Sequence, residues 1–440
     1  MKKLLPLFIS AALGSISASA YADSLADIYD LAKQNDPQLL SVAAQRDQAF
    51  EAITSSRSAL LPQINLTAGY NLTRGDTDLD SGPKTSNDSN DLTAGINFSQ
   101  ELYNRASWIS LDTAEKTARQ ADATYAATQQ SLILRVSQAY FEVLRAKDNL
   151  VFVRAEKAAV GRQLEQTKQR FEVGLSAITD VHDAQAQYDA VLADEVLAEN
   201  DLINSYESLR EITGQEHKNL DVLDTARFSA SRSDSPAEEL IEVAKEKNLS
   251  LLSSRISQDI ARDNISLASS GHLPTLSLDG GYNYGDTSHS DRDYTTDNFN
   301  IGVNLALPLY TGGNVTSQTK QAEYAYVAAS EDLEAQYRSV VKDVRAQNNN
   351  INASIGALKA YEQSVVSAKS ALEATEAGFD VGTRTIVDVL DATRRLYDAN
   401  RNLSNARYDY IISGLQLRQA VGTLSEQDIL NIDAGLKAVN

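Results

Sequence analysis

The spacing of apolar residues divides this chain into long helical segments separated by short strands. In the helical segments, apolar side chains recur about every three to four positions, which places them on one face of a helix. These segments are residues 24–58, 105–172, 177–213, 237–270, 314–377 and 385–420. The second would reach about 100 Å at about 1.5 Å per residue, which is more than a globular domain needs. The pattern therefore predicts long helical rods.

Four shorter segments alternate strictly between apolar and polar residues. They lie at about residues 63–73, 91–103, 275–285 and 297–308. Because successive side chains of a strand point to opposite faces, each segment is expected to be a strand with one apolar face. Its length of about ten residues matches one tilted bilayer crossing, and Tyr103 and Trp108 suit the interface. A hairpin on a soluble core would give the same alternation, but these features favour a membrane wall. The polar residues 74–90 and 285–297 are expected to be loops.

The second half of the chain repeats the first. Residues 171–184 align with residues 379–392 without a gap, at an offset of 208 positions. The offset still holds at Gly214 and Gly422, which end the helices that follow. A register this long indicates an internal repeat.

We therefore divide the mature chain into residues 23–225 and 226–440. Each half is expected to contain a helix, two strands, a long helix, a tight tip and a final helix. The tips lie at residues 173–176 and 381–384, and the second half adds a C-terminal tail. In each half, the helix before the strands and the helix after the tip, placed end to end, are about as long as the long helix. Each half therefore supplies one long helical rod and a second rod of similar length made of two helices.

Residues 1–22 have the features of a secretory signal peptide. Lys2 and Lys3 precede a mostly apolar stretch, and Ala-Tyr-Ala at residues 20–22 is a small-residue cleavage site. Cleavage would leave Asp23 first and change the formal charge from −20 to −22. Such a chain repels phosphate, which argues against nucleic-acid binding. An exported chain without Cys fits a bacterial envelope protein that needs no disulfides.

Four membrane strands are too few to close a barrel, for which about eight is the practical minimum. An open sheet edge in lipid leaves backbone groups unpaired at a cost of several kcal/mol each. Several copies must therefore pool their strands. Two copies would provide eight strands and three would provide twelve, and a lumen wide enough for cargo favours three.

The second tip carries the most distinctive polar residues. Gly382 supplies the backbone freedom for a helix reversal, and Thr385 can cap the next helix with Asp388. Asp388 and Asp391 are spaced i, i+3 and share one helix face. Both carboxylates could simply stabilise the start of the helix, by capping it and by interacting with the helix dipole, with about 0.3–1 kcal/mol from each carboxylate. In a closed trimer the pair would instead form a ring of carboxylates that traps cations.

Over essentially its whole length, the sequence resembles the outer membrane factor family, the efflux and type I secretion channels of Gram-negative bacteria. The matching stretches are the strand after Leu61-Pro62, Arg170-Phe171, and residues 173–175, 177–181, 272–276 and 381–393. The resemblance implies an α+β membrane protein. Its homotrimer would form a twelve-stranded β-barrel in the outer membrane, with four strands from each chain, continued by an α-helical coiled-coil barrel across the periplasm.

The resemblance also implies partners and cargo. A periplasmic adaptor (membrane fusion) protein would join the channel to an inner-membrane pump of the RND, ABC or MFS type. The cargo would be drugs, detergents, bile salts and type I-secreted proteins. The adaptor would dock near the two tips, whose residues are otherwise simple helix reversals: Val173, Gly174, Leu175, Val381, Gly382 and Thr383.

A gate at the helical tips is a further implication of the resemblance. It favours the ring of Asp388 and Asp391, which multivalent cations would block. Arg384, otherwise a solvated turn residue, would pair with Thr179 and Asp180. A second link would join Gln163 to Glu376, and both links would hold the inner coils shut. The implied gate residues are Gln163, Thr179, Asp180, Glu376, Phe379, Arg384, Asp388 and Asp391.

Phe379 departs from the family pattern, which has a gating Tyr at this position. Its missing hydroxyl cannot bond to Asp180, and such a bond contributes about 0.5–1.5 kcal/mol. We therefore expect a looser resting gate, or compensation by Arg384.

Other chemistry is poorly supported. The four His residues are scattered without metal-ligand spacing, and no nucleophile elbow, Walker loop or zincin motif occurs. Asp76, Asp78 and Asp80 resemble the start of a calcium loop, but Ser81 and Asn87 stand where Gly and Glu belong. No enzyme, cofactor or structural metal is expected. The rival interpretation is a soluble periplasmic coiled-coil scaffold.

Overall fold

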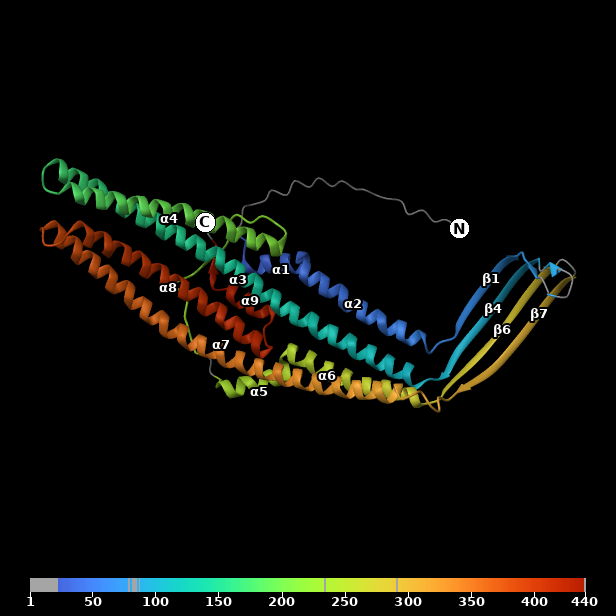
Figure 1. Cartoon of the computed structure of the whole chain (residues 1–440). Helices are drawn as coiled ribbons and strands as arrows, with labels where there is room; N and C mark the ends of the chain where they lie inside the picture. Colours follow the sequence, from blue (N-terminus) through green and yellow to red (C-terminus); the bar gives the residue numbers. More distant parts are fainter. Residues whose placement is uncertain are drawn as a thin grey trace.

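The computed structural model describes residues 23–77, 80, 85–86, 88–232, 235–289 and 292–438. The expected signal peptide lies outside the described residues, as do Asp78, Ser81 and Asn87 of the calcium-loop comparison. Figure 1 shows an elongated molecule, with a β-sheet at one end and the turns of two helical hairpins at the other. The main sheet is antiparallel and the long helices are segregated from it, as in the α+β class.

One antiparallel sheet contains the four long strands in the order β1-β4-β6-β7. Their bounds are β1 (Gln63–Thr73), β4 (Ser89–Tyr103), β6 (Thr275–His289) and β7 (Arg292–Ala306). The register aligns Leu66, Ile96, Tyr282 and Phe299 in one row across the sheet. All four side chains of this row are exposed in the single chain. The alternation of the sequence thus becomes a continuous apolar face.

The loop expected over residues 285–297 is mostly strand. His289 pairs with Arg292 at the end of the β6–β7 ladder, and the Ser288 hydroxyl donates to Asp293 Oδ1 over 2.7 Å. Polar residues continue the ladder because its bonds join backbone groups and need no apolar face. In the other hairpin, β2 (Asp76–Thr77) and β3 (Thr85–Ser86) form a short separate pair.

The single helices expected over residues 24–58 and 237–270 are each two helices. They are α1 (Leu25–Asn35), α2 (Pro37–Ser58), α5 (Ala237–Lys247) and α6 (Leu249–Ser269), followed by a short 3-10 turn, η1 (Ser270–His272). Asp36 and Asn248 occupy the breaks with extended backbone, and each accepts a 2.9 Å hydrogen bond from the third amide of the next helix. The apolar spacing continues across both breaks, so it does not create them. Side-chain caps begin both following helices, and at the first break Pro37 also disfavours a helical Asp36.

Two helical hairpins make up the long arm of the molecule. The first hairpin is α3 (Arg105–Glu172) with α4 (Ile178–Thr213), and the second is α7 (Asn314–Asp380) with α8 (Ile386–Val421). Gly174 and Gly382 turn the tips with φ of 75° and 79°, a region that favours glycine.

Helix α3 lies inside the helical layer, whereas α7 lies at its edge (Figure 1). Four buried residues of α7 stand 208 positions after four buried residues of α3. The α7 residues are Val340, Val344, Ile351 and Leu358, and their α3 counterparts are Leu132, Val136, Val143 and Leu150. Helix α3 continues to bury Val153, Val160 and Leu164 toward its tip, but α7 buries no residue beyond Leu358. The part of α7 nearest the tip therefore packs within the chain on its hairpin partner α8, without any of the described helices of the first half over it.

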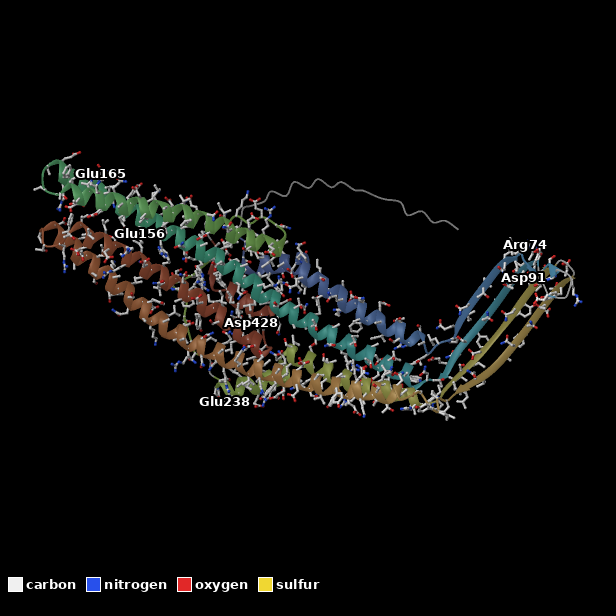
Figure 2. All side chains as sticks on the ribbon, in the orientation of Figure 1. Arg74, Asp91, Glu156, Glu165, Glu238 and Asp428 are labelled. Carbon is white, nitrogen blue, oxygen red and sulfur yellow. The ribbon has the colours of Figure 1, made fainter. Side chains whose placement is uncertain are left out.

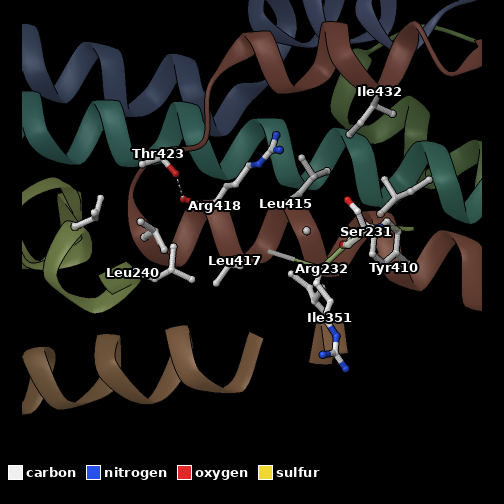
Figure 3. Close-up of a pocket in the computed structure, with 14 residues that line it drawn as sticks. Ser231, Arg232, Leu240, Ile351, Tyr410, Leu415, Leu417, Arg418, Thr423 and Ile432 are labelled. Atoms are coloured by element: carbon white, nitrogen blue, oxygen red, sulfur yellow. Dashed lines mark hydrogen bonds between the residues drawn. The ribbon is translucent and has the colours of Figure 1, made fainter. Parts of the chain in front are cut away.

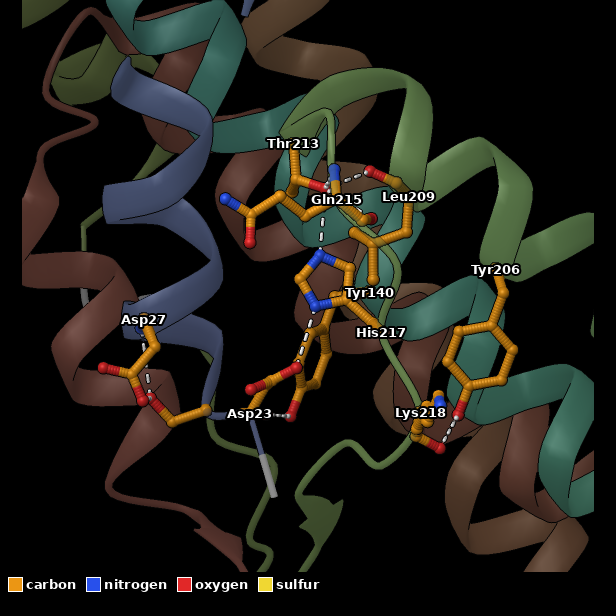
Figure 4. A network of polar contacts seen from close by, with 10 residues as sticks. Asp23, Asp27, Tyr140, Tyr206, Leu209, Thr213, Gln215, His217 and Lys218 are labelled. Carbon is orange, nitrogen blue, oxygen red and sulfur yellow. Dashed lines mark hydrogen bonds and ion pairs between the residues drawn. The ribbon is translucent and has the colours of Figure 1, made fainter. Parts of the chain in front are cut away.

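The C-terminal tail packs against the middle of α3. It contains α9 (Glu426–Asp433) and β8 (Leu436–Lys437), and β8 pairs with β5 (Val222–Leu223). Figure 4 shows the polar network beside it, where His217 bonds to Asp23 Oδ2 over 2.8 Å and to Thr213 Oγ1 over 2.9 Å. The Tyr140 hydroxyl donates to the Asp221 carbonyl over 2.8 Å, and burial raises the pKa of Tyr140. His217 is thus a structural residue.

We predict that Gly422→Ala destabilises the protein more than Gly214→Ala, its counterpart in the first half. Both glycines have positive φ, 83° and 71°, and a left-handed non-glycine residue costs about 1–2 kcal/mol. A Cβ at Gly422 would also overlap the backbone of Lys247 and Asn248, whereas the atom nearest a Cβ at Gly214 is 3.9 Å away. Thermal unfolding followed by helical circular dichroism measures both, and equal losses would contradict the overlap.

Candidate functional site

The candidate site lies at the tips of the two hairpins, which Figure 1 shows next to each other at the end remote from the sheet. In the second tip, Asp388 and Thr385 cap α8 reciprocally. Asp388 Oδ2 accepts from the Thr385 amide and the Thr385 hydroxyl, each over 2.9 Å, and the Asp388 amide donates to Thr385 Oγ1 over 3.3 Å. The pKa of Asp388 lies below its usual range. The largest cause is the hydrogen bond from the Thr385 amide, followed by the bond from the Thr385 hydroxyl, and the nearby Arg384 charge acts in the same direction.

The first tip reaches the same geometry with different residues. Ala177 stands at the position of Thr385 and has no hydroxyl, so Ser176 takes over that role. Asp180 Oδ2 accepts from the Ser176 hydroxyl over 2.6 Å and from the Ala177 amide over 3.2 Å. Asp180 is therefore occupied as a helix cap within its own chain.

Asp391 shares a helix face with Asp388 but is held differently. Its two oxygens accept from Arg394 over 2.7 Å and from Arg395 over 2.5 Å. A groove of about 700 Å³ runs along α7 and α8 next to this face, with Arg384, Asp388 and Asp391 among its lining residues. The groove thus presents charges from α8 beside small residues of α7.

The links implied for the gate do not form within one chain. In the described part of the chain, the Arg384 guanidinium has no hydrogen bond or ion pair and does not reach Thr179 or Asp180. The side chains of Gln163 and Glu376 are equally without such partners among the described residues. These groups remain available to a neighbouring chain.

Arg170 makes the contact between the two tips that the structure does contain. Its guanidinium carbon lies 4.4 Å from the centre of the Phe379 ring, and its Nη2 donates to Asp380 Oδ1 over 3.4 Å. A guanidinium over an aromatic ring makes a cation–π contact, which the face of a Phe or a Tyr ring can provide. Arg170, which the sequence had singled out only as part of a matching stretch, thus connects the two tips within the chain. The compensation expected from Arg384 stays a prediction.

An apolar seam continues below the tips. Ile386 and Leu390 of α8 are 2% and 6% exposed, and they pack with Phe379 against Val160 and Leu164 of α3. The counterpart of Ile386 in the first half, Ile178, is 47% exposed. The start of α8 is therefore buried against α3, whereas the equivalent start of α4 has no such contact in the described part of the single chain.

Apolar side chains also project from the tips themselves. Val173, Leu175 and Val381 are 69%, 77% and 75% exposed. Gly174, Gly382 and Thr383 complete the turns between them. Exposed apolar residues clustered on a surface are typical of a docking site.

Other parts of the structure offer little chemistry. The described residues contain no cluster of three or more His, Asp or Glu side chains suited to a metal ion. None of the described helices has a stretch both long and apolar enough to cross a membrane. Figure 3 shows a cavity of about 480 Å³ bordered by α5, α7, α8 and α9, with Leu240, Ile351 and Ile432 in its mainly apolar lining.

The sequence profile of the outer membrane efflux protein family matches residues 28–215 and 240–423. The chain belongs to this family. Both matched segments contain one helical hairpin with its tip, so the profile covers each half of the chain separately. Membership assigns the protein to the outer membrane and to a family of transport proteins, not of enzymes.

Several relatives extend over the whole chain. Outer membrane protein TolC of Vibrio cholerae serotype O1 is 76% identical over 99% of both chains. Alkaline protease secretion protein AprF of Pseudomonas aeruginosa is 28% identical over 98% of this chain and 90% of its own. The crystal structure of the Campylobacter jejuni CmeC outer membrane channel superposes with a TM-score of 0.78 at 18% identity, over 99% of this chain and 98% of that one. This efflux protein therefore has the fold of a known outer-membrane channel.

We predict a measurable coupling between Arg170 and Phe379 in a double-mutant cycle with Arg170→Ala and Phe379→Ala. A cation over an exposed ring contributes about 0.5–1 kcal/mol, so the two losses of stability should fail to add by about that amount. Arg154→Ala is the matched control, because Arg154 pairs only with Glu195 and Glu199 of the first hairpin. A coupling with Arg154 as large as that with Arg170 would refute the contact.

Proposed function

We propose that three copies of this efflux protein form one continuous channel across the outer membrane and the periplasm. The observation that carries the proposal is the open four-stranded sheet. Strands β1 and β7 are its edges, and every residue along both strands is exposed. Unpaired edges beside an apolar face cost several kcal/mol per backbone group in lipid, so β1 of one chain should pair with β7 of the next. Three sheets then give a barrel of twelve strands.

The helical rods support the same ring. Helix α8 packs on the surface of α3 within the chain. The surface of α7 at the 208-residue offset has no buried residue beyond Leu358. Because the two halves repeat, the hairpin of residues 105–213 from a neighbouring chain should cover α7. Ile178, exposed in the single chain, would then be buried as Ile386 already is. The coiled-coil barrel would thus contain hairpins of the two halves in alternation.

At the tips, the ring would bring together the groups that lack partners in one chain. Arg384 would reach Thr179 and Asp180 of the neighbour, where the Asp180 carboxylate can accept a further bond beside its cap. Gln163 and Glu376 would form the second link. Such contacts between chains would hold the gate closed, and cargo binding at the pump would have to break them.

Asp388 and Asp391 would form the ring of carboxylates inside that gate. Asp388 is the better placed of the two, since its cap uses only Oδ2, while both oxygens of Asp391 are bonded to arginines. A lowered pKa keeps Asp388 ionised at neutral pH. The entrance would therefore be cation-selective.

The exposed apolar tips are the proposed docking surface for a periplasmic adaptor protein, which would connect the channel to an inner-membrane pump of the RND, ABC or MFS type. The cargo would be drugs, detergents, bile salts and proteins of type I secretion, as the protease-secretion relative suggests. Residues 1–22 would be removed as the signal peptide, leaving the halves 23–225 and 226–440.

Purified protein in planar bilayers tests the proposal. We expect heat-modifiable trimers with discrete single-channel currents. A monomer that remains in solution without detergent and never conducts would instead support the soluble scaffold.

We predict that Asp388→Ala combined with Asp391→Ala weakens block by a trivalent cation at least about tenfold, because the ring loses its converging charges. Asp388→Ala alone should account for most of the effect, since Asp391 is already neutralised by its arginines. Asp183→Asn, at the Asp391 position of the first half, is the control. Unchanged block in the double variant would exclude the ring.

We also predict that Phe379→Tyr lowers the resting conductance. The new hydroxyl can donate to Asp180, and each such bond contributes about 0.5–1.5 kcal/mol in three copies. Phe171→Tyr changes the equivalent residue of the first half and should leave the conductance as it is. A resting current equal to or above that of the natural protein would speak against this gate contact.

A further inference from the structure

One carboxyl group interrupts the apolar seam between the two hairpins. Glu156 lies on α3 between the buried residues Val153 and Val160, and it is itself only 5% exposed (Figure 2). The residues of this seam that surround it come from α3, α4 and α8. A carboxyl group at a core position is unusual, because its ionised form loses hydration there.

Glu156 has no compensating partner. It forms no hydrogen bond or ion pair with any residue that the structure describes. The charged and titratable groups facing it are Asp194 on α4 and Arg394, Tyr397, Asp398 and Arg401 on α8. The arginines are bonded elsewhere, Arg401 to Asp398 over 3.3 Å and Arg394 to Asp391 over 2.7 Å.

These surroundings favour the neutral carboxyl. Burial is the largest influence and raises the pKa of Glu156, and the negative charges of Asp398 and Asp194 act in the same direction. Arg401 and Arg394 oppose them without reversing the shift. Arg401 Nε is itself buried without a partner, so the guanidinium is close to the seam but is not aimed at the carboxylate.

We propose that Glu156 is a pH-sensitive switch between the hairpins: its neutral form keeps α3 packed on α8, and its ionised form loosens that seam. Loosening admits more water to the carboxylate, whose oxygens are not completely shielded in the packed state, and lowers the cost of burying its charge. The inference rests on the proposed channel only for its effect on current, because the seam itself lies within one chain.

The direction follows from linkage. A pKa that is raised in the packed state means that the packed state binds the proton more tightly than the loosened state. Packing is therefore favoured at low pH and is weakened as the pH rises through that raised pKa. Each unit by which the two pKa values differ corresponds to about a tenfold change in the ratio of loosened to packed molecules.

The proposed ring would contain two kinds of hairpin contact, α3 with α8 within a chain and α7 with α4 of a neighbouring chain. The switch is present only in the first kind. At the 208-residue offset, Ser364 stands in place of Glu156, and Ala190 and Ala193 stand in place of Asp398 and Arg401. A contact between α7 and a neighbouring α4 would therefore contain no such group. A rise in pH would therefore loosen the seams within the chains, whereas the contacts of α7 with a neighbouring α4 contain no counterpart of Glu156.

The first test is the resting conductance of single channels between about pH 4 and about pH 8. We expect the conductance of the natural protein to rise with pH, and that of Glu156→Gln to stay at the low-pH level throughout. Glu165→Gln removes a charge from an exposed position on the same helix and should follow the natural protein (Figure 2). Asp398→Asn should move the rise to lower pH, since the Asp398 charge favours the neutral carboxyl. Equal pH dependence in the natural protein and Glu156→Gln would overturn the switch.

The second test needs no current. The chain has no Cys, so Ala158→Cys on α3 and Asn402→Cys on α8, both exposed positions, can carry spin labels without further changes. We expect the label separation to widen with pH, and to stay constant when Glu156→Gln is added. If no preparation conducts but the separation widens, the channel proposal fails and the switch stands. A separation that is constant with pH, or that widens toward low pH, refutes the switch.

Discussion

The packing of α8 on α3 is the contact on which the helical arm depends, because it joins the two helical hairpins along the part of the arm that leads to the tips. Polar bonds accompany it: the hydroxyls of Tyr408 and Ser404 donate to Asp148 Oδ2 over 2.7 and 2.5 Å. At the opposite end, β4 and β6 join the halves through a continuous ladder. The seam between α3 and α8 extends to Ile386 and Phe379 at the second tip, so a change in the seam would reach that tip.

Much of the fold could be predicted from the sequence because its elements depend on local patterns. Alternating residues predicted the strands, and Gly214 and Gly422 marked the helix ends. The breaks at Asp36 and Asn248 could not be predicted from spacing, since apolar residues continue through them. Pro37 was a sequence signal for the first break, whereas the second depends on the side-chain cap of Asn248. The extension of β6 to His289 was missed for a related reason: backbone pairing there needs no apolar face.

Contacts of the candidate site between residues close in sequence could be predicted, and contacts between distant segments could not. The cap between Thr385 and Asp388 follows from their spacing, and the arginines on Asp391 could have been found at i+3 and i+4. The contact of Arg170 with Phe379 depends on how two distant tips meet, and no spacing contains that information. The residue type at position 379 gives no signal for this contact, because the face of either a Phe or a Tyr ring can bind a guanidinium.

The two halves repeat in backbone but not in chemistry, and this difference limits how a ring built from them could move. Equivalent hairpin contacts would open together, as all of them would have equal stability. Glu156 faces charged residues of α8, whereas its counterpart Ser364 would face alanines, so the two kinds of contact respond differently to charge. A contact of small residues would have no titratable group, while the seam within each chain contains one. A change in pH should therefore act first within each chain, between α3 and α8.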